Sequence, residues 1–267
     1  MSRRAKGLGL LAIALVAVVI VPGSRRQLTS YALRLTTRTA SRRTDLTLTA
    51  HPRTIADHIV NGAKEEVLRG VRYDASYTAI PYPNGDVPAD RGACTEVIIR
   101  GLRNAGYDLQ QLIHEDMRRR FSEYPGLWGL KAPDPNIDHR RVPNHLVYMR
   151  KHGLEMPRST SGRDAATWQP GDLVYWRLRP GGPTHCGVIS NDRGRGGLPL
   201  VIHNIGPVAR QEDCLTSWEV IGHYRYPPPQ GSNSQGSEDA RRRNLRPQNR
   251  VSSSANPSGD RSMSRSI

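Results

Sequence analysis

Three residues of this chain have the types that a cysteine-based hydrolase needs, namely Cys94, His185 and His203. In such chemistry a thiolate attacks, an imidazole exchanges the proton, and a third polar group orients that imidazole. Cys94 begins a predicted helix, because apolar residues recur at helical spacing after it. The first helical turn favours the thiolate, since the positive end of the helix dipole lies there. The alternative is a small buried hydrophobic residue, as many free cysteines are.

The two histidines belong to predicted strands that follow one another in the sequence. Residues 184–190 and 198–204 have strand patterns, and a polar, Gly-rich turn joins them. If the strands pair in antiparallel fashion, His185 and His203 share one end of the sheet. The alternatives are a surface residue at a strand edge for His185 and a hydrogen-bonded core histidine for His203. His223, in the final strand, is expected to support the site indirectly at most.

These residues must be positioned by the helices and strands around them. The order of the predicted elements indicates an α+β domain over residues 51–226, with N-terminal helices packed on an antiparallel sheet. Apolar periodicity and capping residues predict helices over residues 54–70, 94–106, 109–120 and 143–152. From Trp168 onward the pattern changes to strands, over residues 173–176, 184–190, 198–204 and 218–226.

Candidate substrate-binding residues lie in two further segments. The loop 71–88 runs into the Cys94 helix, and its side chains Tyr77, Tyr82 and Asp86 could line a groove or merely pin the loop to the core. Asp138 and Arg140 belong to a charged run beside a predicted helix N-terminus, which indicates either a solvated turn or a site for an acidic group. The second interpretation predicts that Arg140→Ala weakens substrate binding with little loss of stability.

Both ends of the chain differ from its centre. Residues 1–24 combine a basic start, an apolar run and a small-residue exit, which is typical of a secretory signal peptide. The apolar run is shorter than the roughly 20 residues of a membrane span, and an uncleaved anchor is the alternative. Residues 25–50 are predicted to be a linker, and 227–267 a disordered basic tail.

The net charge of +15 belongs mostly to these ends. Residues 1–50 contain nine Lys and Arg against one acid, and 227–267 contain seven Arg against three acids, so residues 51–226 carry only +3. A folded nucleic-acid-binding domain would carry its charge on its own surface, so nucleic acid is not an expected partner. The basic ends favour contact with an anionic membrane or with wall polymers.

The three cysteines, Cys94, Cys186 and Cys214, allow one disulfide and a free thiol, or no disulfide. A disulfide from Cys94 to either of the others would remove the nucleophile. Strand alternation predicts that Cys186 points to the face opposite His185 and away from the site. No CxxC or Cys/His finger spacing is present, so a structural zinc site is not expected. The proposed cysteine chemistry itself requires neither a metal nor an organic cofactor.

The order of these motifs resembles the NlpC-type branch of the papain-like cysteine hydrolases. It consists of a helix-borne Cys94, then Pro-Gly-Asp-Leu-Val-Tyr-Trp at 170–176, His-Cys-Gly-Val-Ile at 185–189 and Val-Ile-His at 201–203. The resemblance implies a papain-like fold with Cys94 as nucleophile, His185 as base and His203 as the orienting group. Tyr77 resembles the tyrosine that borders the active site in several members.

More narrowly, five motifs resemble an uncharacterised bacterial family known as a domain of unknown function. They are Asp86-Val-Pro, Gly-Ala-Cys-Thr-Glu-Val-Ile-Ile-Arg, Ile-Asp-His-Arg-Arg-Val-Pro-Asn, Ile-His-Asn-Ile-Gly and Gly-His-Tyr-Arg, and the resemblance covers about residues 55–226. Cys94 is followed by Thr-Glu in place of the usual Ser-Gly, and the spacing between His185 and His203 is longer than the common one. These departures from the family pattern affect the prediction of the substrate more than the prediction of the fold.

Taken together, these features predict an exported cysteine peptidase or amidase of the periplasm or cell envelope. Peptidoglycan stem peptides are the expected substrate, by analogy with the family alone. The alternatives are an acyltransferase acting on another amide or ester, and a wall- or glycan-binding module without turnover.

Overall fold

A computed structural model of the chain describes residues 46–229 and 231. The predicted signal peptide or anchor, most of the predicted linker and nearly all of the predicted tail lie outside these residues. Within the described part, none of the helices is both long and apolar enough for a membrane crossing. The end of the predicted linker belongs to the folded part, because the backbone carbonyls of Thr47 and Thr49 accept hydrogen bonds from Lys64 Nζ (3.0 Å) and Asn61 Nδ2 (2.9 Å).

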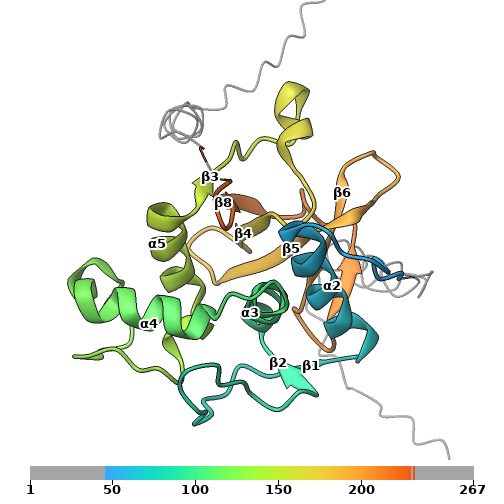
Figure 1. Cartoon of the computed structure of the whole chain (residues 1–267). Coiled ribbons are helices and arrows are strands. Elements are labelled where there is room, and N and C mark those ends of the chain that lie inside the picture. The colour runs from blue at the N-terminus through green and yellow to red at the C-terminus, as the bar shows by residue number, and fades with distance from the viewer. Residues whose placement is uncertain (1–45, 230, 232–267) are drawn as a thin grey trace, which may run out of the picture. The chain divides into compact units, whose positions relative to one another are not determined.

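The helices lie close to where the sequence predicts them. They are α2 (Ile55–Leu68), α3 (Cys94–Asn104), α4 (Leu109–Arg120) and α5 (Val142–His152), and Figure 1 labels each one. Thr54 and Asp57 form a capping box at the start of α2, and Asp108 caps α4 through the backbone N–H of Gln110. Short 3₁₀ turns cover Phe121–Glu123, Asp138–Arg140 and Gly162–Thr167.

The main sheet is antiparallel throughout, with the strand order β3-β8-β4-β5-β6-β7. Its strands are β3 (Leu154–Glu155), β4 (Leu173–Arg177), β5 (Thr184–Arg193), β6 (Pro199–His203), β7 (Arg210–Glu212) and β8 (Glu219–Arg225). The predicted α+β class with an antiparallel sheet is therefore confirmed. The sequence pattern does not predict the short strands β3 and β7. A parallel pair, β1 (Arg72–Tyr73) with β2 (Arg91–Gly92), is also new and leads directly into α3.

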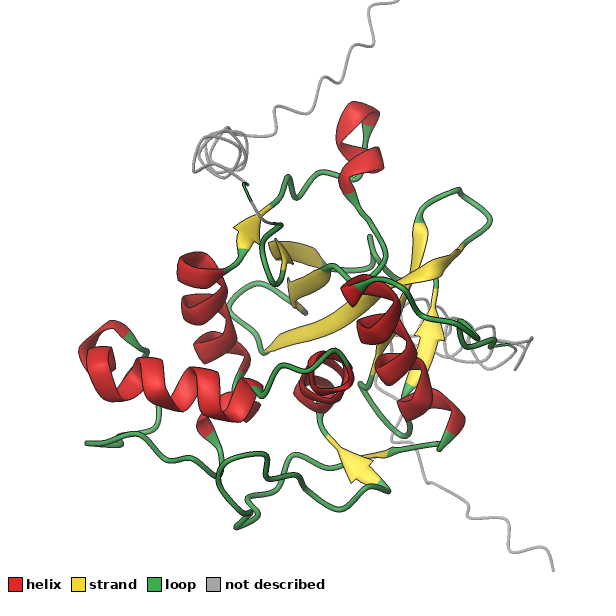
Figure 2. Ribbon diagram, in the orientation of Figure 1, coloured by secondary structure: helices red, strands yellow, loops and turns green. Residues whose placement is uncertain are grey.

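Both faces of the sheet are buried, and the alternation along β4 divides its side chains between them. Leu173 and Tyr175 join the core beneath α2 and α3, whereas Val174 and Trp176 join a second core with Trp168, Cys214 and Leu215. Figure 2 shows α2 and α3 lying in front of the central strands, with α3 viewed nearly along its axis. This packing fixes the N-terminus of α3, and hence Cys94, against the sheet.

The approach of α2 to α3 depends on Gly62. A Cβ at this position would lie 2.7 Å from Asn104 Cβ and 2.9 Å from the carbonyl oxygen of Arg100. Any larger residue would push the two helices apart, because real Cβ atoms do not come so close to backbone. Gly62 therefore helps to hold the helix that begins with Cys94.

Candidate active site

Cys94 is the first residue of α3, and only 7% of it is exposed. Its pKa lies well below the ordinary value for a thiol. The hydrogen bond from the Cys186 side chain is the largest cause, and the His185 ring and the Cys186 backbone add to it. Burial opposes these interactions but does not outweigh them. The site therefore favours a thiolate, as the position at a helix N-terminus predicts.

The structure brings His185 and His203 together at one end of the β5–β6 pair. His185 Nε2 lies 2.9 Å from His203 Nδ1, and both residues are almost completely buried. In the register of the two strands His203 lies opposite Gly187, two residues after His185. A Cβ at Gly187 would lie 2.8 Å from the carbonyl oxygen of Ile202, so the close strand approach that joins the two rings needs glycine there.

Two tryptophans hold the imidazoles in place. The Trp176 ring stacks on His185 with a centroid distance of 5.6 Å and an interplanar angle of 16°. The Trp218 ring meets both imidazoles edge to face, at 5.9 Å from His185 and 6.1 Å from His203. Because buried rings packed in this way cannot turn freely, their nitrogens keep fixed partners.

Beyond the pair, His203 Nε2 contacts two further side chains. Glu212 Oε2 lies 3.3 Å away and Cys214 Sγ 3.5 Å away. These three residues offer nitrogen, oxygen and sulfur atoms within 4.8 Å of one another, and the rest of the described chain contains no second such group that could hold a metal ion. The same contacts are explained without a metal ion, by hydrogen bonds to the imidazole of His203. We therefore describe Glu212 and Cys214 as hydrogen-bonding neighbours of His203.

Arg140 has a different place from the one expected for a substrate-binding residue. Its side chain is 3% exposed and forms an ion pair with the equally buried Glu96, which also accepts a hydrogen bond from the backbone N–H of Ala93. The other guanidinium nitrogens donate to the backbone carbonyls of Ser76 (2.7 Å) and Asp74 (3.3 Å). Arg140 thus ties a loop to the start of α3. The buried ion pair argues against the expectation that Arg140→Ala costs little stability, because the change would leave Glu96 buried without its cation.

The two predicted carboxylates also have partners within the protein. Asp138 is buried and accepts a hydrogen bond from Arg141 Nη1 at 2.9 Å. Asp86 is bound by two guanidinium groups, those of Arg100 (3.0 Å) and Arg103 (2.7 Å) on α3. Both groups therefore stabilise the loops around α3, and a substrate would have to displace internal ion pairs to reach them.

The two predicted tyrosines lie on the surface. Tyr77 is 58% exposed, and its hydroxyl accepts a hydrogen bond from Asn136 Nδ2 at 3.0 Å. Tyr82 meets His114 edge to face at 4.9 Å. Neither of these contacts involves Cys94, so a role for Tyr77 and Tyr82 in binding substrate stays a prediction.

Tyr73, a tyrosine that the sequence pattern does not single out, interacts electrostatically with Cys94. Its pKa is raised, first by partial burial and then by the negative charges of Cys94 and Glu96. Tyr73 is placed by the β1–β2 pair, in which it lies opposite Gly92, just before the nucleophile. Two-residue strands are too short to leave a periodic pattern in the sequence. The position of Tyr73 could therefore not be predicted.

Asn204 is a second residue that pattern alone does not identify. It follows His203 directly, and its side-chain Nδ2 donates to the carbonyl oxygens of Gly92 (3.1 Å) and Val71 (3.3 Å). Asn204 is itself buried. It therefore locks the segment that carries the nucleophile to the strand that carries the second histidine.

All three cysteines are free thiols, so Cys94 is not consumed by a disulfide. The expected alternation is observed, since Cys186 belongs to the helix-facing core while His185 stacks on Trp176 of the opposite core. The conclusion that Cys186 points away from the site is nevertheless wrong. Cys94 and Cys186 belong to the same helix-facing core, and the Cys186 side chain is the largest cause of the lowered pKa of Cys94.

His223 belongs to a separate cluster. Its Nε2 lies 2.9 Å from Asp172 Oδ2, its Nδ1 lies 2.7 Å from the carbonyl oxygen of Pro157, and the Trp168 ring stacks on it at 3.6 Å. Arg225 completes the cluster with two hydrogen bonds to the Asp172 carboxylate. These contacts include neither Cys94 nor His185, so His223 does not support the site directly.

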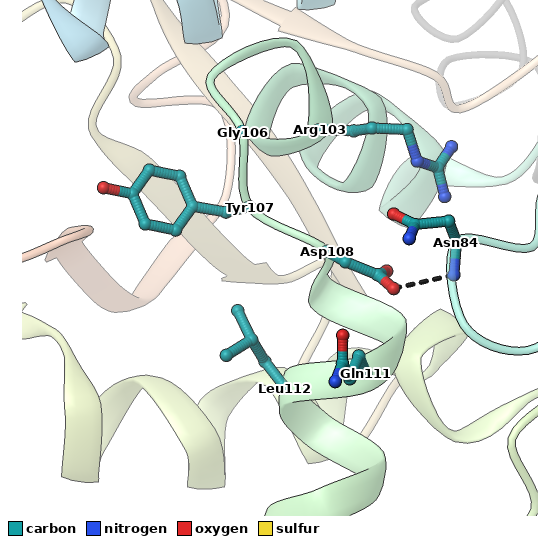
Figure 3. Close-up of a pocket in the computed structure, with 7 residues that line it drawn as sticks. All are labelled: Asn84, Arg103, Gly106, Tyr107, Asp108, Gln111 and Leu112. Carbon is teal, nitrogen blue, oxygen red and sulfur yellow. Dashed lines mark hydrogen bonds between the residues drawn. The ribbon is translucent and has the colours of Figure 1, made fainter.

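A surface pocket lies at the turn between α3 and α4 and in front of the loop that carries Asn84 (Figure 3). The backbone N–H of Asn84 donates to Asp108 Oδ2 at 2.7 Å across it. None of the residues discussed above as candidate catalytic groups lines it; its lining consists of Asn84, Arg103, Gly106, Tyr107, Asp108, Gln111 and Leu112.

Comparison with known proteins finds relatives for the folded part. A family model described as a domain of unknown function, DUF1287, matches residues 60–226. The uncharacterised protein YijF of Escherichia coli (strain K12) is 49% identical over 168 residues, which cover 63% of this chain and 80% of that protein. A search of the solved structures finds no match.

Proposed function

This chain belongs to the DUF1287 family, and we propose that it is a cysteine hydrolase with a papain-like fold of the NlpC type. The observation that carries the proposal is a buried thiol at a helix N-terminus, whose pKa is lowered in part by the imidazole of His185, and His185 in turn lies at hydrogen-bond distance from His203. A core residue has no need of such surroundings. The order of a helix-borne cysteine followed by an antiparallel sheet with two histidines supports the same conclusion.

In the first half of the reaction, the Cys94 thiolate attacks the carbonyl carbon of an amide. The S–C bond forms while the carbonyl electron pair moves to oxygen, and the backbone N–H of Cys94 is the natural donor to that oxyanion. The C–N bond then breaks, and the protonated His185 transfers its proton to the departing nitrogen. An amine leaves, and the acyl group remains on Cys94 as a thioester.

In the second half, His185 accepts a proton from water as the water oxygen adds to the thioester carbon. The S–C bond breaks, the carboxylic acid product leaves, and the thiolate and protonated imidazole are restored. Throughout, His203 Nδ1 holds His185 Nε2, which keeps the other nitrogen of His185 directed at the reacting atoms.

We further propose that the substrates are peptides of the cell wall. The support is indirect and comes from the signal-like N-terminus and the basic ends of the chain, which suit an exported protein that meets anionic membrane or wall polymers. The folded part carries little net charge, in agreement with a substrate other than nucleic acid.

The test is turnover of purified peptidoglycan stem peptides, with new amino termini detected by mass spectrometry. We expect cleavage by the native sequence and a loss of roughly 10³-fold or more in Cys94→Ala, since the nucleophile is removed. Binding of wall fragments without cleavage, equal in both proteins, would instead establish a binding module. Transfer of the acyl group to an added amine would establish an acyltransferase.

A further inference from the structure

We propose that Glu212 is a positioning residue of this site, which fixes the protonation of His203 and thereby the direction of a hydrogen-bond chain from Glu212 through His203 and His185 to Cys94. Its catalytic meaning rests on the proposed function. The contacts from Glu212 through His203 to His185 belong to the resting protein and can be tested without substrate.

The argument begins with Glu212 on β7. Its side chain is 14% exposed, its Oε2 lies 3.3 Å from His203 Nε2, and its Oε1 faces Arg210 Nη1 at 3.5 Å. A carboxylate can only accept hydrogen bonds, so the proton between Glu212 and His203 must sit on Nε2 of the imidazole. A neutral imidazole carries one N–H, and therefore Nδ1 of His203 presents a lone pair.

That lone pair determines the state of the next ring. His185 Nε2 lies 2.9 Å from His203 Nδ1 and must be the donor. The other nitrogen of His185 is then the basic one, and it is the nitrogen left to exchange a proton with the thiol of Cys94. When His185 takes up that proton, both of its nitrogens donate, one to the thiolate and one to His203, without any rotation of the rings.

Two other features support this assignment. Burial lowers the pKa of His203, which keeps the ring neutral; a protonated ring would place a second N–H against His185 and lose the acceptor. Cys214 Sγ also lies near His203 Nε2, at 3.5 Å, but a thiol sulfur is a weak acceptor and selects a tautomer poorly. The carboxylate is thus the group that makes one tautomer of His203 clearly preferred.

The experiment is ¹⁵N NMR of the imidazole nitrogens in the resting protein, together with the rate at which iodoacetamide alkylates Cys94 at pH 6.5. The native protein should show His203 with a protonated Nε2 and a bare Nδ1. Glu212→Ala should give a mixture of tautomers and alkylate on the order of tenfold more slowly, which corresponds to a rise of one unit in the thiol pKa. Glu212→Gln should retain the native tautomer, because its amide oxygen still accepts. Glu219→Ala, which removes an exposed carboxylate from β8, is the matched control and should change neither signal.

Several results would overturn the proposal. One is a native His203 with its proton on Nδ1, which decides the matter even if Glu212→Ala does not fold. Another is a Glu212→Ala protein with the native tautomer and alkylation rate. A third is one equivalent of a metal ion in the native protein that is lost in both Glu212→Ala and Cys214→Ser. Failure to cleave wall peptides would leave all three readouts intact, so it would count against the proposed function alone.

Discussion

Two buried clusters in this molecule use the same residue types to different ends. In each of them a histidine lies against a carboxylate and beside a tryptophan ring: His203 with Glu212 and Trp218, and His223 with Asp172 and Trp168. Both nitrogens of His223 face oxygen acceptors, and the Asp172 carboxylate is also bound by Arg225. The His203 chain differs because it continues to a second imidazole, that of His185, which contributes to the lowered pKa of the Cys94 thiol.

This difference separates a stabilising network from one that can do chemistry. Both nitrogens of His223, and Nε and Nη2 of Arg225, meet oxygen atoms of the protein, and these contacts include no nucleophile, so the cluster contributes rigidity. In the His203 chain, the tautomers that we propose leave one basic nitrogen of His185 available for proton exchange with Cys94. The comparison predicts that substitutions in the His223 cluster change stability, whereas substitutions in the His203 chain change reactivity.

The largest effect is expected at Asp172. Asp172→Ala removes a buried carboxylate and leaves both Arg225 and His223 without their shared partner, so the free energy of unfolding should fall by about 3–5 kcal/mol. Chemical denaturation measures this loss, and Asp90→Ala, which removes an exposed carboxylate paired with Arg72, should leave the free energy of unfolding nearly unchanged. Equal losses in the two variants would contradict the structural role assigned to the cluster.

Arg140 should behave like Asp172 although it lies beside the helix that begins with Cys94. Arg140→Ala leaves Glu96 buried without its cation and frees the carbonyls of Ser76 and Asp74, for which we expect a loss of about 3 kcal/mol in the free energy of unfolding. Denaturation curves test this, with Arg118→Ala on the exposed end of α4 as the control. A stable Arg140→Ala protein that binds wall peptides more weakly would restore the interpretation of Arg140 as a substrate-binding residue.

A smaller effect, on reactivity alone, is expected at Cys186. Its side chain is the largest cause of the lowered pKa of Cys94, so Cys186→Ala should raise that pKa toward the ordinary value. The alkylation profile of Cys94 would then move to higher pH, and the rate below neutral pH would fall by roughly tenfold for each unit of the shift. A matched substitution at Cys214 should leave the profile in place, because Cys214 contacts His203 Nε2 and not the thiol of Cys94. An unchanged profile in Cys186→Ala would remove Cys186 from the site.

Much of this arrangement follows from local pattern. The helix that begins with Cys94 and the strands that carry His185 and His203 are predictable, because apolar periodicity and turn residues lie within one element. The contacts of Glu212, Tyr73 and Asn204 are not predictable, since they depend on the register of very short strands. The position of Cys186 shows the same limit: alternation correctly separates it from His185, but only the packing of α3 on the sheet decides which face holds the nucleophile.

The central claim, that Cys94 and His185 form a reactive thiolate–imidazole pair, is tested most directly by the pH dependence of alkylation. Each cysteine is followed by mass spectrometry in the unreduced native protein and in His185→Ala. We predict that Cys94 alone reacts quickly below neutral pH, that burial keeps Cys186 unreactive because it raises that thiol's pKa, and that His185→Ala moves the Cys94 profile to higher pH. A Cys94 that stays unreactive, or whose profile is the same in His185→Ala, would contradict the account.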